Sequence, residues 1–270
     1  MADDLEFDLD TERAHGARIY DYILGGKDNF QPDRDAGDNS LKVWPALRTH
    51  MRANREFMHR VGRYLAAECG VRQFLDIGTG IPTPPNLHDV VQAVDPTARV
   101  VYTDNDPIVL AHARALMTGT PEGRTAYIDA DMRDPQTILS APGFRETLDL
   151  NRPIGLLLIA IVHFIEDDDE AYRVVAQAVD ELPGGSYLAM SIATDEFDPV
   201  PLAEVRRQYH EYGETLVFRD RARALRFFDG LEIVEPGLVQ VHKWRPEPGG
   251  VSGAVSDKDI AMYGAVARKP

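Results

Sequence analysis

The residues best suited to chemistry lie in one short segment, where residues 76–80 read Asp-Ile-Gly-Thr-Gly after a brief apolar run. An acid followed by a glycine turn is typical of a buried parallel strand that delivers its carboxyl end to a ligand. The glycines let the backbone approach that ligand closely. The side chain of Asp76 can hold an ammonium group directly or through water. Taken alone, the segment is equally compatible with a plain strand–turn–helix joint.

Three prolines follow this turn, at Pro82, Pro84 and Pro85. They remove backbone N–H donors from the positions where a phosphate-binding helix would supply them. The dinucleotide pattern GxGxxG also fails, because its last position is Thr83. The loop therefore favours a nucleoside ligand without a pyrophosphate.

A second acid, Asp104, ends the apolar run 100–103 and is followed by Asn105. An acid at the end of the second strand, some twenty or more residues after the glycine turn, can accept both ribose hydroxyls. Asp106 precedes Pro107 and a helical pattern, so we expect Asp106 to be the N-cap of a helix.

Two further segments follow predicted strands. Asp131 comes after the run 125–128, where an acid can accept an adenine amino group, and Met132 can pack on the ring. By itself, Asp131 is also compatible with a solvated loop. His163 follows the run 156–161, which contains Ala160, and can act as a base, a hydrogen-bond donor or a packing residue.

The elements that position these residues alternate along the chain, which predicts a doubly wound, mostly parallel sheet. Its expected strands are 74–77, 100–103, 125–128, 156–161, 186–191, 231–234 and 262–267, with helices at 87–94, 107–117, 135–139 and 168–181. The last two strands form a terminal hairpin and make the sheet seven-stranded. Before them, residues 196–228 indicate a helical insertion that caps the sheet edge or buttresses it.

The N-terminal region has a different character. Residues 1–12 are acidic and predict a tail or docking arm, and residues 13–40 lack clean periodicity, with turns at Gly25-Gly26 and Pro32. Residues 41–68 predict an amphipathic helix, on whose apolar stripe Asn54 falls as a core amide or a ligand contact. We therefore divide the chain into an arm or lid over 1–40 and a main domain over 41–270.

Composition narrows the function. The net charge is −15, from 44 acids and 29 bases, which disfavours nucleic acid as a partner. The single cysteine, Cys69, excludes an intrachain disulfide. The longest apolar run, 154–165, is too short to span a bilayer and the acidic N-terminus shows no secretory signal. We expect a cytoplasmic protein that binds neither membrane nor metal; its oligomeric state is not predicted.

Together, the motif at 76–80, Asp104, Asp131 and the turn at 182–187 resemble the class I S-adenosylmethionine-dependent methyltransferases over residues 70–195. The resemblance implies a Rossmann-like methyltransferase fold with S-adenosylmethionine as cofactor. The third glycine common in that family's motif is Pro82 here. This departure leaves the expected fold intact but makes the loop stiffer.

A closer resemblance covers nearly the whole chain. Residues 17–30, 104–107, 226–230 and 244–246 are similar to an actinobacterial family of S-adenosyl methyltransferases. That likeness implies cofactor binding and leaves the methyl acceptor open.

On this basis, we expect methyl transfer to a small-molecule acceptor. The cofactor contacts expected from the motifs are Asp76, Gly78, Thr79, Gly80, Asp104, Asn105, Asp131, Met132 and Ala160. As a lid, the N-terminal segment would bring Arg18 or Lys27 to the cofactor carboxylate; it can also be a docking arm that covers the core. Candidates for a base are His163, then Tyr20 and His210.

Two rival functions stay open. One is a sensor or regulator that binds S-adenosylmethionine without transferring its methyl group. The other is a nicotinamide-dependent oxidoreductase, which needs a pyrophosphate site that the prolines after Gly80 make poor.

Overall fold

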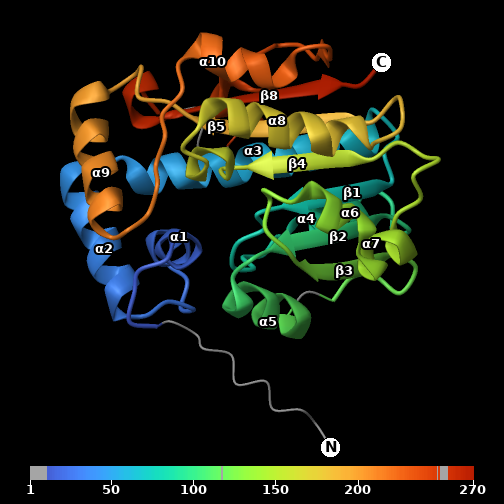
Figure 1. The fold of residues 1–270 in the computed structure, drawn as a ribbon, viewed down its shortest axis with the longest axis horizontal. Helices are drawn as coiled ribbons and strands as arrows, with labels where there is room; N and C mark the ends of the chain where they lie inside the picture. Colours follow the sequence, from blue (N-terminus) through green and yellow to red (C-terminus); the bar gives the residue numbers. More distant parts are fainter. Residues whose placement is uncertain (1–10, 117, 248, 250–254) are drawn as a thin grey trace, which may run out of the picture.

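The computed structural model describes residues 11–116, 118–247, 249 and 255–270 (Figure 1). Most of the acidic segment predicted as a tail, residues 1–10, lies outside this part of the chain. The strands are β1 Gln73–Ile77, β2 Arg99–Asp104, β3 Arg124–Asp129, β4 Gly155–Ile159, β5 Tyr187–Ala193, β6 Glu232–Ile233, β7 Val239–Gln240 and β8 Met262–Arg268. The α-helices are α1 Gly16–Leu24, α2 Gln31–Val43, α3 Leu47–Ala67, α4 Leu87–Gln92, α5 Pro107–Leu116, α6 Pro135–Ser140, α7 Pro142–Thr147, α8 Asp168–Asp180, α9 Pro199–Glu211 and α10 Arg221–Leu225. Short 3₁₀ helices are η1 Val162–Phe164, η2 Arg226–Phe228, η3 Val241–Lys243 and η5 Asp257–Asp259.

The strands form a single sheet in the order β3-β2-β1-β4-β5-β8-β6, with β7 paired to β8. The first five strands are parallel, and β8 runs antiparallel to β5. The predicted doubly wound, mostly parallel sheet is therefore confirmed, and all seven expected strands occur. The eighth, β7, is only two residues long and too short to give a sequence pattern.

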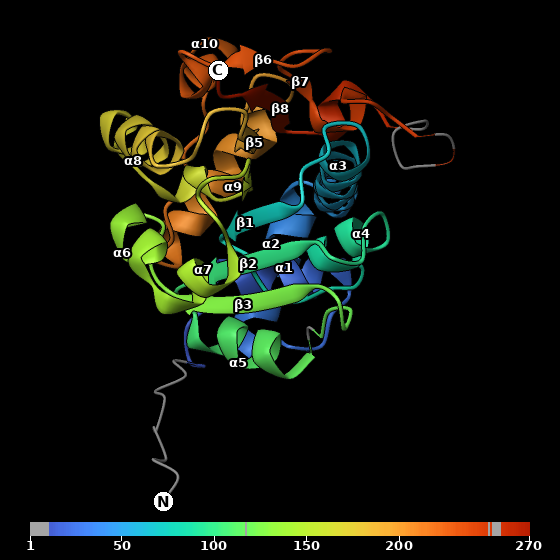
Figure 2. The same ribbon diagram turned by 90° about the vertical axis from the view of Figure 1, so that its right-hand side faces the viewer.

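Both faces of the sheet are buried, as the continuous apolar run of β4 predicted. Leu156 belongs to the apolar cluster on one face, and its neighbour Leu157 to the cluster on the other. Figure 2 shows α3 and α4 covering one face and α6 and α8 covering the other. The carboxyl ends of the parallel strands are thereby held rigidly at one edge.

Helices α1, α2 and α9 lie at that edge, on the left in Figure 1. Helix α2 packs against α9, although more than 150 residues separate them in the chain. Pro32 was predicted to mark a turn, and this was wrong because it lies in the first turn of α2, where a missing N–H costs nothing.

The insertion 196–228 is only partly helical. After α9 the chain turns at Gly213, with φ of 81°, and residues 212–220 run without helix to α10. We call this stretch the cover segment. Its backbone contacts include Val217 N–H donating to His163 O in η1 and Arg219 N–H donating to Ala193 O at the end of β5, both at 2.9 Å. Both bonds join it to residues that follow or end strands of the sheet.

Within the residues described, no helix combines the length and apolar character needed to cross a membrane.

Candidate active site

A cavity of about 420 Å³ opens at the carboxyl edge of the sheet. Its walls come from the ends of β1, β2 and β4, from α1, α3 and α9, and from the cover segment 212–220. Of the residues predicted from sequence, eleven line it: Tyr20, Asp76, Gly78, Thr79, Gly80, Asp104, Asn105, Asp131, Met132, Ala160 and His163.

The glycine turn after β1 adopts a conformation that other residues resist. Gly78 and Gly80 have φ of 76° and 67°, in the left-handed region. A Cβ on Gly78 would also lie 2.6 Å from the side chain of Ile161, whereas one on Gly80 would meet open space. The turn is thus shaped by backbone conformation at both glycines and by close packing at the first.

Asp104 is a backbone-anchored acid at the end of β2. Its Oδ2 accepts from Gly80 N–H at 2.9 Å, and its Oδ1 accepts from Asp106 N–H at 3.0 Å. Burial raises the pKa of the Asp104 carboxyl, and these two N–H donors oppose the rise. Asp106 in turn accepts from Ile108 N–H at 2.8 Å, as expected of the residue that begins α5.

Asp76 is buried at the end of β1, and within the described chain no hydrogen bond to its carboxylate is found. Burial raises the pKa of this carboxyl to about 7; Arg55 opposes the rise and Asp104 adds to it. A ligand ammonium at this position would satisfy a carboxylate that the protein leaves without a partner.

Arg55, on α3, is a cavity-lining cation that the sequence analysis did not identify. Its guanidinium donates to Thr83 O and, at 3.0 Å, to Pro85 O, which fixes the proline loop after the glycine turn. The only sequence signal was its place beside Asn54 on the helical stripe.

Asp131 lies at the rim, with its side chain 39% exposed. Arg133 N–H donates to its Oδ1 at 2.8 Å, and Asn105 Nδ2 donates to its Oδ2 at 3.4 Å. Met132 is buried beside it. The acid and the apolar side chain expected to contact adenine therefore lie together at this rim.

Three predicted contacts lie away from the cavity. Arg18 is buried in an ion pair with Asp33, at 3.3 Å, because the fully buried Asp33 needs a cation. Lys27 is exposed, and so is His210 on the outer side of α9, where its neighbour Tyr209 lines the cavity instead.

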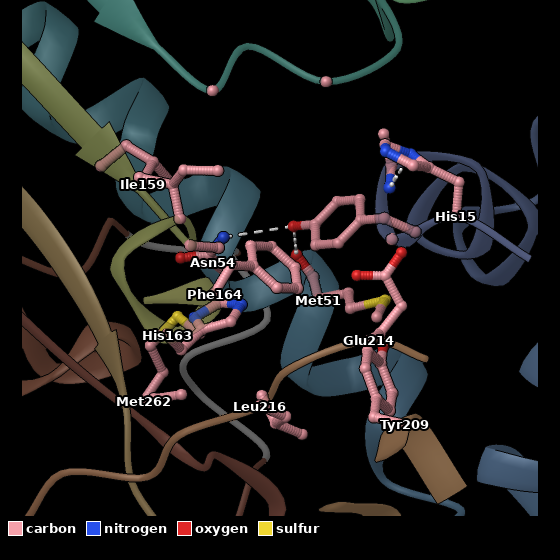
Figure 3. Close-up of a pocket in the computed structure, with 18 of the residues that line it drawn as sticks. His15, Met51, Asn54, Ile159, His163, Phe164, Tyr209, Glu214, Leu216 and Met262 are labelled. Carbon is pink, nitrogen blue, oxygen red and sulfur yellow. Dashed lines mark hydrogen bonds between the residues drawn. The ribbon is translucent and has the colours of Figure 1, made fainter. Parts of the chain in front are cut away.

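Deeper in the cavity, α1 and α3 are joined by polar contacts (Figure 3). The Tyr20 hydroxyl donates to Met51 O at 3.0 Å and accepts from Asn54 Nδ2 at 3.2 Å. Asn54 Oδ1 is buried and has no hydrogen-bond partner among the residues that the structure describes. Asn54 is thus buried, as a core amide would be, and it also lines the cavity; its contact with a ligand stays a prediction.

Two histidines border this deeper part. Burial lowers the pKa of His163 to about 3, with Arg219 and His50 acting in the same direction. Burial lowers the pKa of His50 to about 4. His50 Nδ1 accepts from Ala261 N–H at 3.2 Å, so its proton is on Nε2. Both imidazoles are neutral at pH 7, and His50 was missed because its partner is more than 200 residues away.

Among the residues described, no group of three or more His, Cys, Asp or Glu side chains is arranged to hold a metal ion.

Comparisons with known proteins agree with this geometry. No curated protein matches the chain. Among solved structures, a DUF574 family protein from Streptomyces avermitilis is 58% identical, with a TM-score of 0.95, over 97% of this chain and 100% of that one. A candidate methyltransferase from Thermobifida fusca is 40% identical, with a TM-score of 0.89, over 97% of each chain.

An O-methyltransferase family protein from Burkholderia thailandensis shares the fold alone, at 15% identity and a TM-score of 0.51, over 78% of this chain and 55% of that one. The family model described as S-adenosyl methyltransferase matches residues 3–270. The resemblance expected from residues 17–30 and from the strand-end acids is therefore confirmed. The chain belongs to this S-adenosyl methyltransferase family and is an S-adenosylmethionine-dependent methyltransferase.

Proposed function

We propose that this enzyme methylates a small molecule enclosed between the sheet edge and the cover segment. The observation that carries the proposal is one continuous cavity that extends from the glycine turn into an apolar chamber. Its volume, about 420 Å³, falls within the roughly 300–1,000 Å³ of small-molecule sites. The chamber is lined chiefly by Trp44, Leu47, Met51, Met58, Leu202, Val205, Leu216, Phe218 and Met262.

The polar end of the cavity fits the cofactor. In the proposed arrangement Asp76 takes the ammonium and Arg55 takes the carboxylate, in place of the Arg18 or Lys27 expected from sequence. Asp104 keeps acceptor capacity for ribose hydroxyls beyond its two backbone bonds. Asp131 and Met132 stand where the adenine would lie, and the glycine turn allows close approach.

In our proposal the described part of the N-terminal segment, residues 11–40, serves as the lid of this site. His15, just before α1, and Ala17 and Tyr20 on α1 line the cavity, and α2 packs against α9. The cover segment closes the remaining side. Such an enclosure excludes water and favours a compact acceptor over a polymer.

When bound, S-adenosylmethionine supplies an electrophilic sulfonium methyl group. The protein's contribution is then chiefly to hold donor and acceptor in line. His163 is suited to contact the acceptor as a neutral hydrogen-bonding group. A pKa near 3 is far from the optimum for a base at pH 7. Tyr20 donates its proton to a carbonyl, which suits it to positioning rather than to proton abstraction.

Methyl-labelled S-adenosylmethionine tests the proposal. The purified enzyme is incubated with an extract of a source organism, and label is followed in the small-molecule, protein and nucleic-acid fractions. We expect label in the small-molecule fraction, lost in His163→Ala and kept in His210→Ala, whose histidine is exposed. Label in protein or RNA would contradict the proposal. Binding of S-adenosylhomocysteine without any labelled product would favour the sensor.

A further inference from the structure

The buried amide of Asn54 has a fixed orientation. Because the carbonyl oxygen of Met51 can only accept a hydrogen bond, the Tyr20 hydroxyl donates its proton to that oxygen. The Tyr20 oxygen can then only accept, which makes the Asn54 group facing it the NH₂. Asn54 Oδ1 therefore points away from Tyr20, and Figure 3 shows it on the side of Ile159 and His163.

This oxygen is a buried acceptor without a donor. Asn54 is only 2% exposed and lines the cavity, and Oδ1 has no partner. Leaving a buried acceptor unpaired is unfavourable, so such groups usually have a ligand or structural partner. Oδ1 is closed off from solvent, so a donor of the ligand reaches it only after a side-chain rearrangement of the kind common on binding. That partner must present an N–H or O–H group.

A second acceptor lies across the same chamber. Glu214, on the cover segment, is half-buried and lines the cavity. Its backbone N–H donates to Tyr209 O at 2.9 Å, but within the described chain its carboxylate makes no hydrogen bond or ion pair. Figure 3 shows this carboxylate beside Met51 and above Tyr209, directed into the cavity.

Positive charge is confined to the cofactor end. Among the described lining residues, the cations are Arg55, bonded to the proline loop, and Arg133, bonded to Asp131 and to Phe164 O. The chamber histidines are neutral. An anionic acceptor would therefore meet Glu214 without a compensating cation.

We propose, on the basis of the proposed small-molecule methyl transfer, that the acceptor is a primary or secondary amine with an apolar body. Asn54 Oδ1 and the Glu214 carboxylate receive its N–H groups. The aromatic rings of Trp44, Tyr209 and Phe218 line the same chamber and suit an ammonium group entering it.

The reaction balances with these groups. The ammonium form loses one proton to solvent as it enters, its remaining N–H groups face Asn54 Oδ1 and the Glu214 carboxylate, and the freed nitrogen lone pair forms the new N–C bond. The C–S bond breaks and its electron pair stays on sulfur, so the positive charge moves to the methylated nitrogen. The Glu214 carboxylate stays ionised and faces the positive charge of the methylated nitrogen until the product leaves.

Tyr20 is a positioning residue in this arrangement, because it orients Asn54 from the lid helix α1. Tyr20→Phe removes the acceptor for Asn54 Nδ2 and leaves the aromatic packing in place. It should weaken amine binding while the affinity for S-adenosylhomocysteine stays the same.

The test uses the full chain, first loaded with S-adenosylhomocysteine, and compares phenethylamine, 2-phenylethanol and phenylacetate by calorimetry. We expect the amine to bind best. Glu214→Gln and Asn54→Leu should each weaken amine binding about tenfold, as loss of a hydrogen bond to a charged partner predicts, and weaken binding of the uncharged alcohol less. Glu211→Gln is the matched control, because Glu211 pairs with Arg207 on the outer surface.

Equal or better binding of the alcohol or acid, or no loss in either variant, would overturn the amine assignment. A matching loss of S-adenosylhomocysteine affinity in Asn54→Leu would do the same, because Asn54 would then contact the cofactor. A different result would contradict the proposed function and not the amine assignment: phenethylamine binds as expected, yet no acceptor in an extract gains label from S-adenosylmethionine.

Discussion

Gly80 and Asp104 are joined by a 2.9 Å hydrogen bond from the Gly80 N–H to Oδ2 of the acid. This bond ties the turn after β1 to the end of β2. Asp104, the residue that we propose accepts the ribose hydroxyls, thus also fixes the loop beside it, so one carboxylate would serve both the cofactor and the loop.

We expect Asp104→Asn to weaken both cofactor binding and the hydrogen bonding that fixes the turn after β1. An amide places an NH₂ against one of two backbone N–H donors, so a bond to a charged group worth about 1.5–3 kcal/mol is lost. We predict at least about a tenfold lower affinity for S-adenosylhomocysteine by calorimetry. Asp129→Asn, at the exposed end of β3, is the control and should change nothing. Unchanged affinity in Asp104→Asn would remove Asp104 from the site.

The two glycines of the turn should respond differently to alanine. Both have positive φ, which costs an alanine about 1–2 kcal/mol. Only at Gly78 would the new Cβ also strike Ile161, at 2.6 Å. Urea denaturation should therefore show a larger loss of stability in Gly78→Ala than in Gly80→Ala. Equal losses of stability would mean that the Ile161 side chain moves aside at no cost in free energy.

The sheet could be predicted from sequence because its signals are local. Apolar runs such as 74–77 and 156–161 must be buried strands, and glycines or acids at their ends mark the ligand edge. The strand-end residues Asp76 and Asp104 therefore lie where the sequence placed them. The two-residue β7 gives no such signal, because its pairing with β8 is decided by tertiary contacts.

The part of the site formed by α1, α3 and the cover segment could not be predicted, because it depends on contacts between side chains that are far apart in the sequence. The sequence does not distinguish Arg18 from Arg55 as the cation that lines the cavity. In the structure, Arg18 pairs with the buried Asp33, whereas Arg55 lines the cavity. The cover segment was expected to be helical, but residues 214–220 form no helix and are bonded through Val217 and Arg219 to His163 and Ala193. Glu214 lies on this non-helical stretch and lines the cavity.

Cofactor affinity should depend on pH through Asp76. Its pKa in the folded protein is raised by burial to about 7, so below that pH the carboxyl is largely protonated. An ammonium ligand favours the charged form and expels the proton. Affinity for S-adenosylhomocysteine should therefore rise by up to about tenfold per pH unit toward pH 7 and level off above it. Calorimetry in two buffers of different ionisation enthalpy would count the released proton.

Asp76→Asn should bind weakly at every pH and flatten this profile. Without ligand, the folded wild type keeps a proton that the unfolded chain loses near pH 4. Its stability should thus fall as pH rises toward 7, and this fall should be smaller in Asp76→Asn. If stability falls with rising pH as steeply in Asp76→Asn as in the wild type, the titrating group would be the neighbouring Asp104.

Arg18→Met should destabilise the protein with little effect on binding. It leaves the fully buried Asp33 without its cation, a change that typically costs about 3–5 kcal/mol. Since Arg18 does not line the cavity, calorimetry below the melting transition should give a nearly unchanged affinity for S-adenosylhomocysteine. A selective loss of affinity with normal stability would restore Arg18 to the cofactor site.

Arg55→Met separates the two tasks assigned to Arg55, which are to hold the cofactor carboxylate and to brace the proline loop. S-adenosylhomocysteine carries that carboxylate, and 5′-methylthioadenosine lacks it. If the carboxylate contact exists, the variant should lose at least about tenfold in affinity for the first ligand and little for the second. Arg52→Met, at an exposed position of α3, is the matched control. An equal loss for both ligands would show that Arg55 acts only through the carbonyls of Thr83 and Pro85.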